Sequence, residues 1–402
     1  MSRAPRPRLL AAAGLCVLLS VSACAVTGDA DDPASPAPAA ADQTTDAPTS
    51  AAVVRSNVRA GATQVDLDQQ VRVRVVRGTF EDLRVTTAKG DPVAGALNPA
   101  RTLWTSEGLL RQDTRYRVRG NAVDADGVAT AYQARFATRA LTLDEQTYPS
   151  FVADGATVGV GMPAIVRFDI PVTDKASIER HLKVTSAPAQ PGSWHWLSDT
   201  EVHFRPKAYW KPGTEVTVKA DVGGVPAGNG IYGQLDRTVG FTVGDAMVSK
   251  VDMRSHQMKV YRNGDLLRTI PITTGEQPKF TTRTGTKVIM EKFESRRMSS
   301  ETTGIPVDSA DGYDLDDVRY AMRLTYSGEF IHAAPWSVPS QGSANVSHGC
   351  TGMSTADAEW LYQNSSIGDV VEYVGSDRPM TVANGYGDWN LPYAEWQAGS
   401  SL

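Results

Sequence analysis

The sequence predicts a mainly β protein. Two immunoglobulin-like β-sandwich modules, at residues 53–138 and 139–246, come first. They precede a third domain at residues 247–376, which is mostly β and contains one short helix. Residues 71–75 read Val-Arg-Val-Arg-Val, an alternation that is typical of a strand with one face in water. A second alternation at residues 116–119 (Tyr-Arg-Val-Arg) returns about a hundred residues later, at 215–218, a spacing that matches one immunoglobulin-like module. Only residues 355–364 have a clearly helical pattern, with Ser354 in the N-cap position.

Turn signals separate the predicted strands. Residues 89–92 (Lys-Gly-Asp-Pro) and 126–127 (Asp-Gly) lie between strands of the first module. In the third domain, Asn263 and Gly264 supply the two positive φ values that a two-residue hairpin requires. Residues 377–402 form an aromatic C-terminal strap, which we expect to dock on a neighbouring module because large aromatic residues are rarely left in water: Tyr386, Trp389, Tyr393 and Trp396.

The second module has an aromatic pair and two histidines. Trp194 and Trp196 flank His195, so both indoles face one side of a strand. Such a pair could stack on a sugar, but aromatic side chains dominate sandwich cores, and we expect core packing. No cysteine or paired carboxylate pattern accompanies His195 or His203, so they are expected to be surface or core residues rather than metal ligands.

Length and composition limit the classes of function. A chain of 402 residues with 41% hydrophobic and 21% charged residues is long and apolar enough for several folded domains. Its 40 basic and 45 acidic residues give a net charge of −5, which disfavours a nucleic-acid partner. We expect a monomer.

The first residues are typical of a secretory signal peptide, residues 1–23. Arg3, Arg6 and Arg8 precede an apolar run from Leu9 to Leu19, which is shorter than the roughly 20 residues of a transmembrane helix. Residues 24–52 are rich in Ala, Pro, Asp, Ser and Thr and are predicted to form a flexible linker.

The three cysteines have different expected fates. Cys16 lies in the apolar run and would be removed with it. Residues 21–24 (Val-Ser-Ala-Cys) resemble the lipobox of bacterial lipoproteins, which implies that Cys24 is lipidated and anchors the chain to the outer face of the cytoplasmic membrane. Cys350 is then left without a partner in an oxidising compartment, where an odd cysteine is an intermolecular bridge, a reactive thiol or a small buried hydrophobe.

The surroundings of Cys350 favour a reactive thiol. His332 and His348 lie in the same region, and a thiol needs a neighbouring imidazole or aligned dipoles to become a good nucleophile at neutral pH. His348 shares a face with Cys350 in an extended strand, whereas the fold would have to bring in His332, and the spacing alone does not rank them. Gly349 allows a sharp turn and close approach to a carbonyl, which suits an oxyanion site for acyl transfer.

Two metal sites are conceivable. His332, His348 and Cys350 could bind zinc, but no carboxylate base is spaced as in a zincin. Residues 308–317 are acidic but lack the alternating ligands of a calcium loop, and a solvated loop is expected. We therefore expect neither a metal nor a cofactor.

The third domain closely resembles the L,D-transpeptidase family, whose signature is a histidine upstream of Ser-His-Gly-Cys. The resemblance covers residues 247–376 and is carried by Pro271, Thr274-Gly275, Thr284-Gly285-Thr286, Tyr326-Ser327-Gly328, residues 332–337 and residues 347–350. The order of lipobox, two immunoglobulin-like modules, catalytic domain and strap also resembles the larger cell-wall members of the family.

The resemblance implies roles for individual residues. Cys350 would be the nucleophile and His332 the general base, and the backbone amides of His348, Gly349 and Cys350 would form the oxyanion site, with Ser347 completing the motif. Residues at the substrate pocket would be Tyr313, Met298, Trp336 and Ala333. Two positions depart from the family pattern: Ala333 replaces a frequent Ser, and Gly352 replaces a frequent Asn.

The resemblance also implies the reaction. The substrate would be the tetrapeptide stem of peptidoglycan, and release of D-alanine would leave a thioester that the amine of another stem attacks. Carbapenem-type β-lactams are expected to acylate the same sulfur. The alternatives are a hydrolytic L,D-carboxypeptidase and an inactive scaffold whose modules bind the cell wall.

Overall fold

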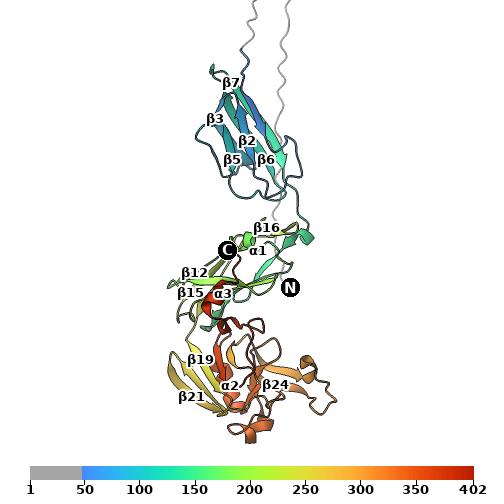
Figure 1. Ribbon diagram of the computed structural model, residues 1–402, viewed down its shortest axis with the longest axis vertical. Coiled ribbons are helices and arrows are strands. Elements are labelled where there is room, and N and C mark those ends of the chain that lie inside the picture. The colour runs from blue at the N-terminus through green and yellow to red at the C-terminus, as the bar shows by residue number, and fades with distance from the viewer. Residues whose placement is uncertain (1–47) are drawn as a thin grey trace, which may run out of the picture. The chain divides into compact units, whose positions relative to one another are not determined.

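The computed structural model describes residues 48–402 and confirms the mainly β architecture (Figure 1). The predicted signal peptide, Cys24 and most of the predicted linker lie outside the described residues. No helix within the described range is long and apolar enough to span a bilayer.

The first group of strands forms a four-stranded and a three-stranded sheet, in the orders β1-β2-β5-β4 and β3-β6-β7. Alternate residues of β2 are buried, as its Val-Arg alternation predicts. The buried side chains Val73, Phe80, Trp104 and Tyr116 belong to one core cluster. The strands are β1 (Val53–Ser56), β2 (Arg72–Val76), β3 (Thr79–Thr87), β4 (Gly95–Leu97), β5 (Leu103–Ser106), β6 (Arg115–Val123) and β7 (Ala129–Ala137).

The second group forms two four-stranded sheets, β10-β18-β15-β12 and β13-β14-β11-β9, and a small sheet β16-β17-β8. Trp194 and Trp196 are buried in its core, as expected for packing rather than sugar binding. The elements are η1 (Leu143–Glu145), β8 (Gln146–Thr147), β9 (Pro149–Phe151), β10 (Thr157–Val158), β11 (Ala164–Phe168), α1 (Lys175–Glu179), β12 (Leu182–Ala187), β13 (Gly192–Trp196), β14 (Glu201–Pro206), β15 (Glu215–Ala220), β16 (Pro226–Gly228), β17 (Ile231–Gly233) and β18 (Arg237–Val243).

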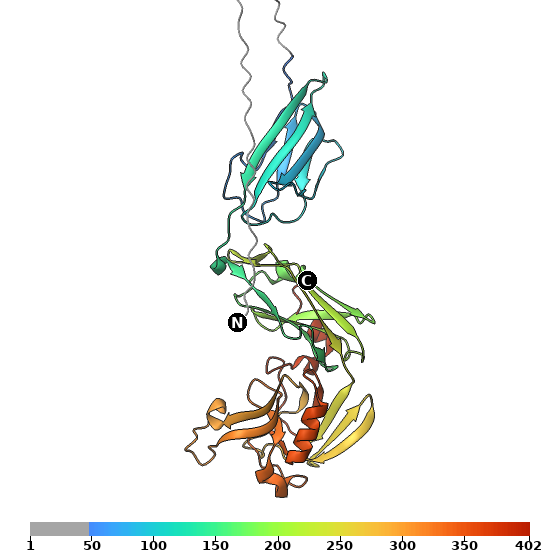
Figure 2. The same cartoon turned by 180° about the vertical axis from the view of Figure 1, so that it is seen from behind.

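The third group contains a five-stranded sheet, β21-β20-β19-β27-β22, and a four-stranded sheet, β23-β24-β25-β26. Helix α2 contacts β24 and β25, and its buried Ala358 and Leu361 share a core cluster with residues of both sheets (Figure 2). The elements are β19 (Met247–Asp252), β20 (Gln257–Arg262), β21 (Asp265–Pro271), β22 (Gly285–Val288), β23 (Glu291–Ser299), η2 (Ser300–Thr303), β24 (Asp314–Arg323), β25 (Phe330–Ala333), η3 (Pro335–Ser340), β26 (Thr351–Met353), α2 (Thr355–Asn364), β27 (Val370–Val374), η4 (Asp388–Asn390) and α3 (Tyr393–Gln397).

Two local predictions in this region are confirmed. The side chain of Ser354 accepts a hydrogen bond from the amide of Asp357 and caps α2. Asn263 and Gly264 have φ values of 52° and 97° and connect β20 to β21 in a tight hairpin. Helices α1 and α3 were not predicted, because five residues are too few to reveal a helical period.

The C-terminal strap packs on the second group of strands, as its aromatic residues predict. The indole of Trp396 is fully buried, stacks on His195 with 4.4 Å between ring centroids, and donates a hydrogen bond to the Ser193 carbonyl oxygen at 2.9 Å. Trp389 donates to the Gly161 carbonyl oxygen at 2.8 Å. The guanidinium of Arg205 lies 4.9 Å from the ring centroids of both Trp389 and Trp396.

His203 links the same strap to strand β14 and is a core histidine, as expected. Its ring is fully buried, with Nδ1 2.8 Å from Asp388 and Nε2 2.8 Å from Glu201. The ion cluster thus joins a strand of the second group to a residue 185 positions later in the chain.

Candidate active site

Two neighbouring strands position the candidate nucleophile and base. Strands β25 and β26 run parallel, and His332 on β25 is paired in register with Gly352 on β26. Cys350 lies immediately before β26, two residues from Gly352, so its side chain and that of His332 are directed to the same face of the sheet. The structure thereby brings His332 to the Ser-His-Gly-Cys segment.

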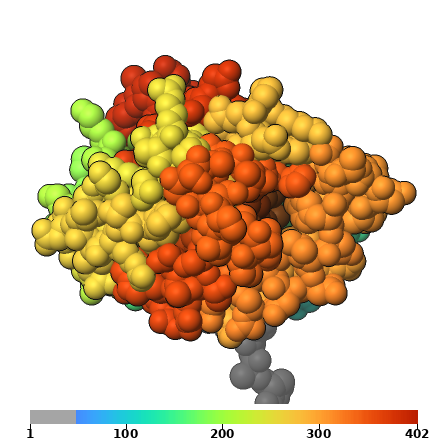
Figure 3. Space-filling model, turned by 90° about the horizontal axis from the view of Figure 1, so that it is seen from below, coloured from blue at the N-terminus to red at the C-terminus, as the bar shows by residue number. Residues whose placement is uncertain are grey.

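A pocket of about 320 Å³ collects most of the predicted site residues. The orange part of the surface, which belongs to the third group of strands, is visibly hollowed in Figure 3. The pocket is lined by Met298, Tyr313, Leu315, His332, Trp336, Val346, Ser347, His348 and Cys350. Ala333 is not among these residues: its side chain packs in the core cluster beside α2.

His332 is oriented as a base by the backbone of the next residue. Its Nδ1 lies 2.8 Å from the Ala333 carbonyl oxygen, which can only accept, so Nδ1 carries the hydrogen and Nε2 is left to take a proton. Burial lowers the pKa of His332, although the Ala333 carbonyl raises it, so the ring is neutral at neutral pH. Because the contact is made by the main chain, Ala333 orients the ring as well as a serine would.

Cys350 is a neutral thiol in this structure. Its Sγ donates to the Gly328 carbonyl oxygen at 3.5 Å, and burial, the largest effect, raises the pKa of the thiol to about 11. Among the described residues no hydrogen bond joins this sulfur to either histidine. The thiol must therefore turn from Gly328 toward the pocket and transfer its proton to a base before it can attack.

The loop before Cys350 is shaped by Ser347. Its Oγ donates to the Cys350 carbonyl oxygen at 2.6 Å and accepts from the Gly349 amide at 3.1 Å. Gly349 has φ of 126°, a value that favours glycine, and its carbonyl oxygen accepts a hydrogen bond from Thr282 Oγ1 at 2.8 Å. Ser347 thus acts on the conformation of the loop.

These contacts alter the expected oxyanion site. The Gly349 amide is occupied by Ser347, whereas no acceptor for the amides of His348 and Cys350 is found in the part of the chain that the structure covers. Two of the three expected amides are therefore available to an oxyanion.

The His348 ring is packed between aromatic residues. Its centroid lies 4.3 Å from that of Phe280 and 5.1 Å from that of Tyr313. No polar partner of this ring is found within residues 48–402. His348 forms part of the pocket wall, and His332 is the histidine with an oriented, available nitrogen.

Sequence reasoning missed the residues that fix the loop from behind. Asn345 Oδ1 accepts from the amide and hydroxyl of Thr274 at 3.0 and 2.8 Å, and Asn345 Nδ2 donates to the Met253 carbonyl oxygen at 2.8 Å. Their partners are 71 and 92 positions away. The only local signal is an asparagine close to the motif, and asparagine side chains commonly bond loop backbone.

Gly352 fits a tight space. A Cβ at this position would lie 2.8 Å from Cβ of Ala334 and 3.1 Å from Cγ2 of Thr273. A larger side chain therefore requires these neighbours to shift.

The fold and the site together define a cysteine-dependent acyltransferase. A model of the L,D-transpeptidase catalytic domain matches residues 247–372, and a model of a bacterial Ig domain matches residues 62–226. L,D-transpeptidase 2 of Mycobacterium tuberculosis is 35% identical over 348 residues, which cover 86% of this chain and 84% of the relative. L,D-transpeptidase 5 of the same species is 37% identical over 340 residues, which cover 83% of this chain and 73% of the relative.

A solved structure agrees with these sequence matches. The structure of the LD transpeptidase LdtMt1 in complex with imipenem is 38% identical, with a TM-score of 0.50, and the match covers 57% of this chain and 99% of that one. The chain belongs to the L,D-transpeptidase family.

Proposed function

We propose that this L,D-transpeptidase cross-links third-position diamino acids of peptidoglycan stems through a thioester on Cys350. The observation that carries the proposal is that Cys350 and His332, with a free Nε2, line one pocket. The similarity to L,D-transpeptidases 2 and 5 of Mycobacterium tuberculosis supports a transpeptidase reaction.

The first half-reaction breaks an amide bond and forms a thioester. His332 Nε2 accepts the thiol proton, and Sγ attacks the carbonyl carbon between the diamino acid and the terminal D-alanine. The backbone amides of His348 and Cys350 would donate hydrogen bonds to the oxyanion. When the C–N bond breaks, His332 returns the proton to the amine of the departing D-alanine.

The second half-reaction regenerates the thiol. The side-chain amine of another stem loses a proton to His332 and attacks the thioester carbonyl, and the C–S bond breaks as the thiolate recovers that proton. If water takes the place of the amine, the same steps give a tripeptide, which is the product of an L,D-carboxypeptidase. Trp336, whose ring centroid lies 5.9 Å from that of His332, is proposed to cover the acyl group together with Met298 and Tyr313.

Carbapenem-type β-lactams are proposed to acylate the same sulfur. Attack of Cys350 on the β-lactam carbonyl opens the ring, and the released nitrogen takes the proton from His332. The relative solved with imipenem supports this proposal.

We further propose that the protein is exported and anchored to the outer face of the cytoplasmic membrane by lipid on Cys24. Residues 24–52 would hold the folded part away from the lipid surface. Metabolic labelling with a fatty-acid analogue tests this point: the label is expected on wild type and absent from Cys24→Ala. Equal labelling of both would reject the anchor.

Mass spectrometry after incubation with tetrapeptide muropeptides tests the reaction. Wild type is expected to give a cross-linked dimer and free D-alanine, and Cys350→Ala neither, while keeping the wild-type circular dichroism spectrum. A tripeptide product alone would establish the carboxypeptidase, and an unchanged substrate would establish the inactive scaffold. Cross-linking by Cys350→Ala would overturn the assignment of the nucleophile.

A further inference from the structure

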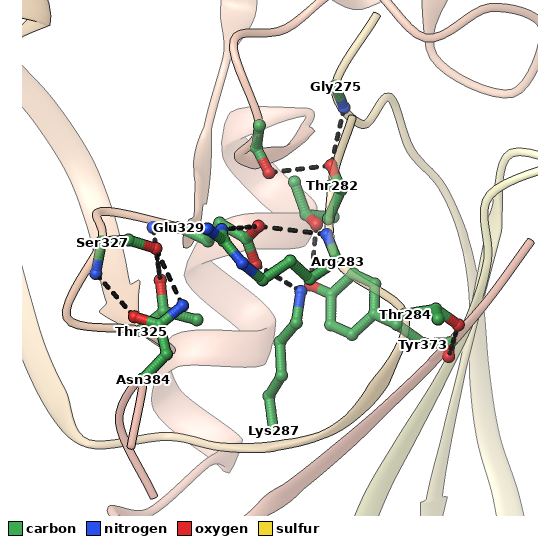
Figure 4. Close-up of polar contacts among 12 residues, drawn as sticks. Gly275, Thr282, Arg283, Thr284, Lys287, Thr325, Ser327, Glu329, Tyr373 and Asn384 are labelled. Atoms are coloured by element: carbon green, nitrogen blue, oxygen red, sulfur yellow. Dashed lines mark hydrogen bonds and ion pairs between the residues drawn. The ribbon is translucent and has the colours of Figure 1, made fainter. Parts of the chain in front are cut away.

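A buried ion cluster lies behind Cys350. The carboxylate of Glu329 accepts from Lys287 Nζ at 2.5 Å, and from Arg283 through Nη1 at 2.9 Å and the backbone amide at 3.0 Å (Figure 4). The side chain of Lys287 is fully buried, and those of Glu329 and Arg283 are 6% and 16% exposed. The mechanism above uses none of the three.

Stability alone does not account for such a cluster. Burial disfavours charge, and it lowers the pKa of Lys287 even though Glu329 favours the ammonium form. Apolar side chains of similar volume are often as stable as a buried ion cluster or more so. Its position relative to Cys350 is therefore informative.

Each member of the cluster is connected to one residue of the segment 349–351. Glu329 follows Gly328, whose carbonyl oxygen accepts from Cys350 Sγ. Arg283 follows Thr282, whose hydroxyl donates to the Gly349 carbonyl oxygen.

The third connection runs through an aromatic ring. Lys287 Nζ lies 3.7 Å from the ring centroid of Tyr373, whose hydroxyl is hydrogen-bonded to Thr351 at 2.7 Å. Glu329 also precedes β25, the strand that carries His332. One cluster therefore supports both strands that position the nucleophile and base.

The cluster also carries charge. Two cations and one carboxylate leave an excess of one positive charge when all three side chains are ionised. Positive charge favours a thiolate and negative charge disfavours it. After burial, which has the largest effect, the charge of Glu329 raises the pKa of the Cys350 thiol and the charge of Lys287 lowers it, with the effect of Glu329 the larger of the two.

We propose that Lys287, Glu329 and Arg283 are positioning residues of the active site: their cluster fixes segment 349–351, and within it the charge of Lys287 favours the thiolate of Cys350 whereas that of Glu329 disfavours it. The inference rests on the proposed role of Cys350 as nucleophile. Other titratable or charged groups near this sulfur are not changed in the test below: His332, His348, Tyr313, Tyr373, Arg296, Arg297 and Arg323.

The test is the rate at which iodoacetamide alkylates Cys350 in the full chain at pH 8. The rate is followed on the proteolytic peptide that contains Cys350, because the sequence has three cysteines. Below the pKa of the thiol, this rate follows the thiolate fraction. Lys287→Met removes a positive charge and is expected to slow alkylation roughly three- to tenfold, and Glu329→Gln is expected to accelerate it by a similar factor.

The double variant Lys287→Met/Glu329→Gln restores the net charge, and its rate is expected to return to within about twofold of wild type. A cluster that only holds the fold predicts changes in the same direction for both single variants, because each breaks the same contact. Changes in the same direction, or no change in either, would overturn the electrostatic role.

Lys259→Met on β20 is the matched control, because Lys259 is exposed and the substitution removes the same charge. Its rate is expected to equal that of wild type, and slowing equal to that of Lys287→Met would overturn the proposal by showing an effect of overall charge. If Lys287→Met does not fold, Glu329→Gln carries the test alone. An unchanged or slower alkylation rate in Glu329→Gln would then reject the proposal.

This readout is independent of turnover. Cross-linking by Cys350→Ala would reject the proposed function and leave the alkylation rates unaffected. If the alkylation rates of Lys287→Met and Glu329→Gln do not change in opposite directions, the proposed role of the cluster is rejected. That result leaves cross-linking by wild type unaffected.

Discussion

Raising the pH from about 6 to 9.5 is expected to weaken the attachment of the C-terminal strap at His203. This ring is fully buried between Asp388 and Glu201, each 2.8 Å from one of its nitrogens. Burial alone would lower the pKa of the imidazole, but the two carboxylates outweigh it and raise the pKa from 6.5 to about 9. Because the pKa is higher in the folded state, the stabilisation is complete below pH 6.5 and is lost as the pH rises through 9.

The size of the effect follows from the shift. A change from 6.5 to about 9, at 1.36 kcal/mol per unit, corresponds to roughly 3 kcal/mol of unfolding free energy. Glu201 acts at the other end of the pH scale. Burial raises its pKa, but His203 and Arg167 lower it to about 2, so its contribution is present above 4.5 and is lost as the pH falls through 2. The cluster of Glu201, His203 and Asp388 is expected to contribute most to the free energy of unfolding between about pH 4.5 and 6.5.

Urea denaturation followed by tryptophan fluorescence measures this contribution at pH 6 and pH 9.5. His203→Gln keeps a hydrogen-bonding side chain that does not take up a proton, so its unfolding free energy should fall less than that of wild type across this range. His181→Gln is the matched control, because it replaces a histidine whose Nδ1 lies 2.8 Å from the Ser177 carbonyl oxygen rather than from a carboxylate. Identical pH dependence in wild type and His203→Gln would refute the reasoning.

Three further substitutions test the packing and the loop. Trp396→Ala should cost about 3–5 kcal/mol and expose the strap to proteolysis, since the indole is fully buried; a wild-type urea midpoint would contradict this. Ser347→Ala removes two hydrogen bonds of the loop and should slow acylation by imipenem about tenfold, whereas an unchanged rate in stopped-flow absorbance would exclude the proposed loop role. Ala333→Ser should acylate within about twofold of wild type, because the carbonyl that orients the base belongs to the main chain; a larger gain would mean that the hydroxyl matters.

Much of the fold could be predicted because period-two alternation is a local property of the sequence. Strand β2 and the Asn263–Gly264 hairpin are encoded within a few residues, and so is the Ser354 cap of α2. The docking of the strap was predictable from its aromatic residues, but its partners were not. Trp396 bonds a carbonyl 203 positions earlier, and no local pattern specifies that pairing.

The site was predictable in part. Cys350 and His332 were selected by a motif and a resemblance, and the structure brings them to one pocket. The occupied amide of Gly349 and the core position of Ala333 could not be foreseen, because they depend on how the loop and strand pack. Lys287 and Glu329 are 42 positions apart, and each is unremarkable alone.

Trapping of the acyl-enzyme is the most direct test of the central claim. Full-length protein is mixed with a tetrapeptide muropeptide, quenched in acid, and analysed by peptide mass spectrometry. The account predicts an acyl stem that lacks D-alanine on Cys350, formed at least about 100-fold more slowly in His332→Ala and at the wild-type rate in His181→Ala. An adduct on another residue, or equal rates in the two histidine variants, would contradict it.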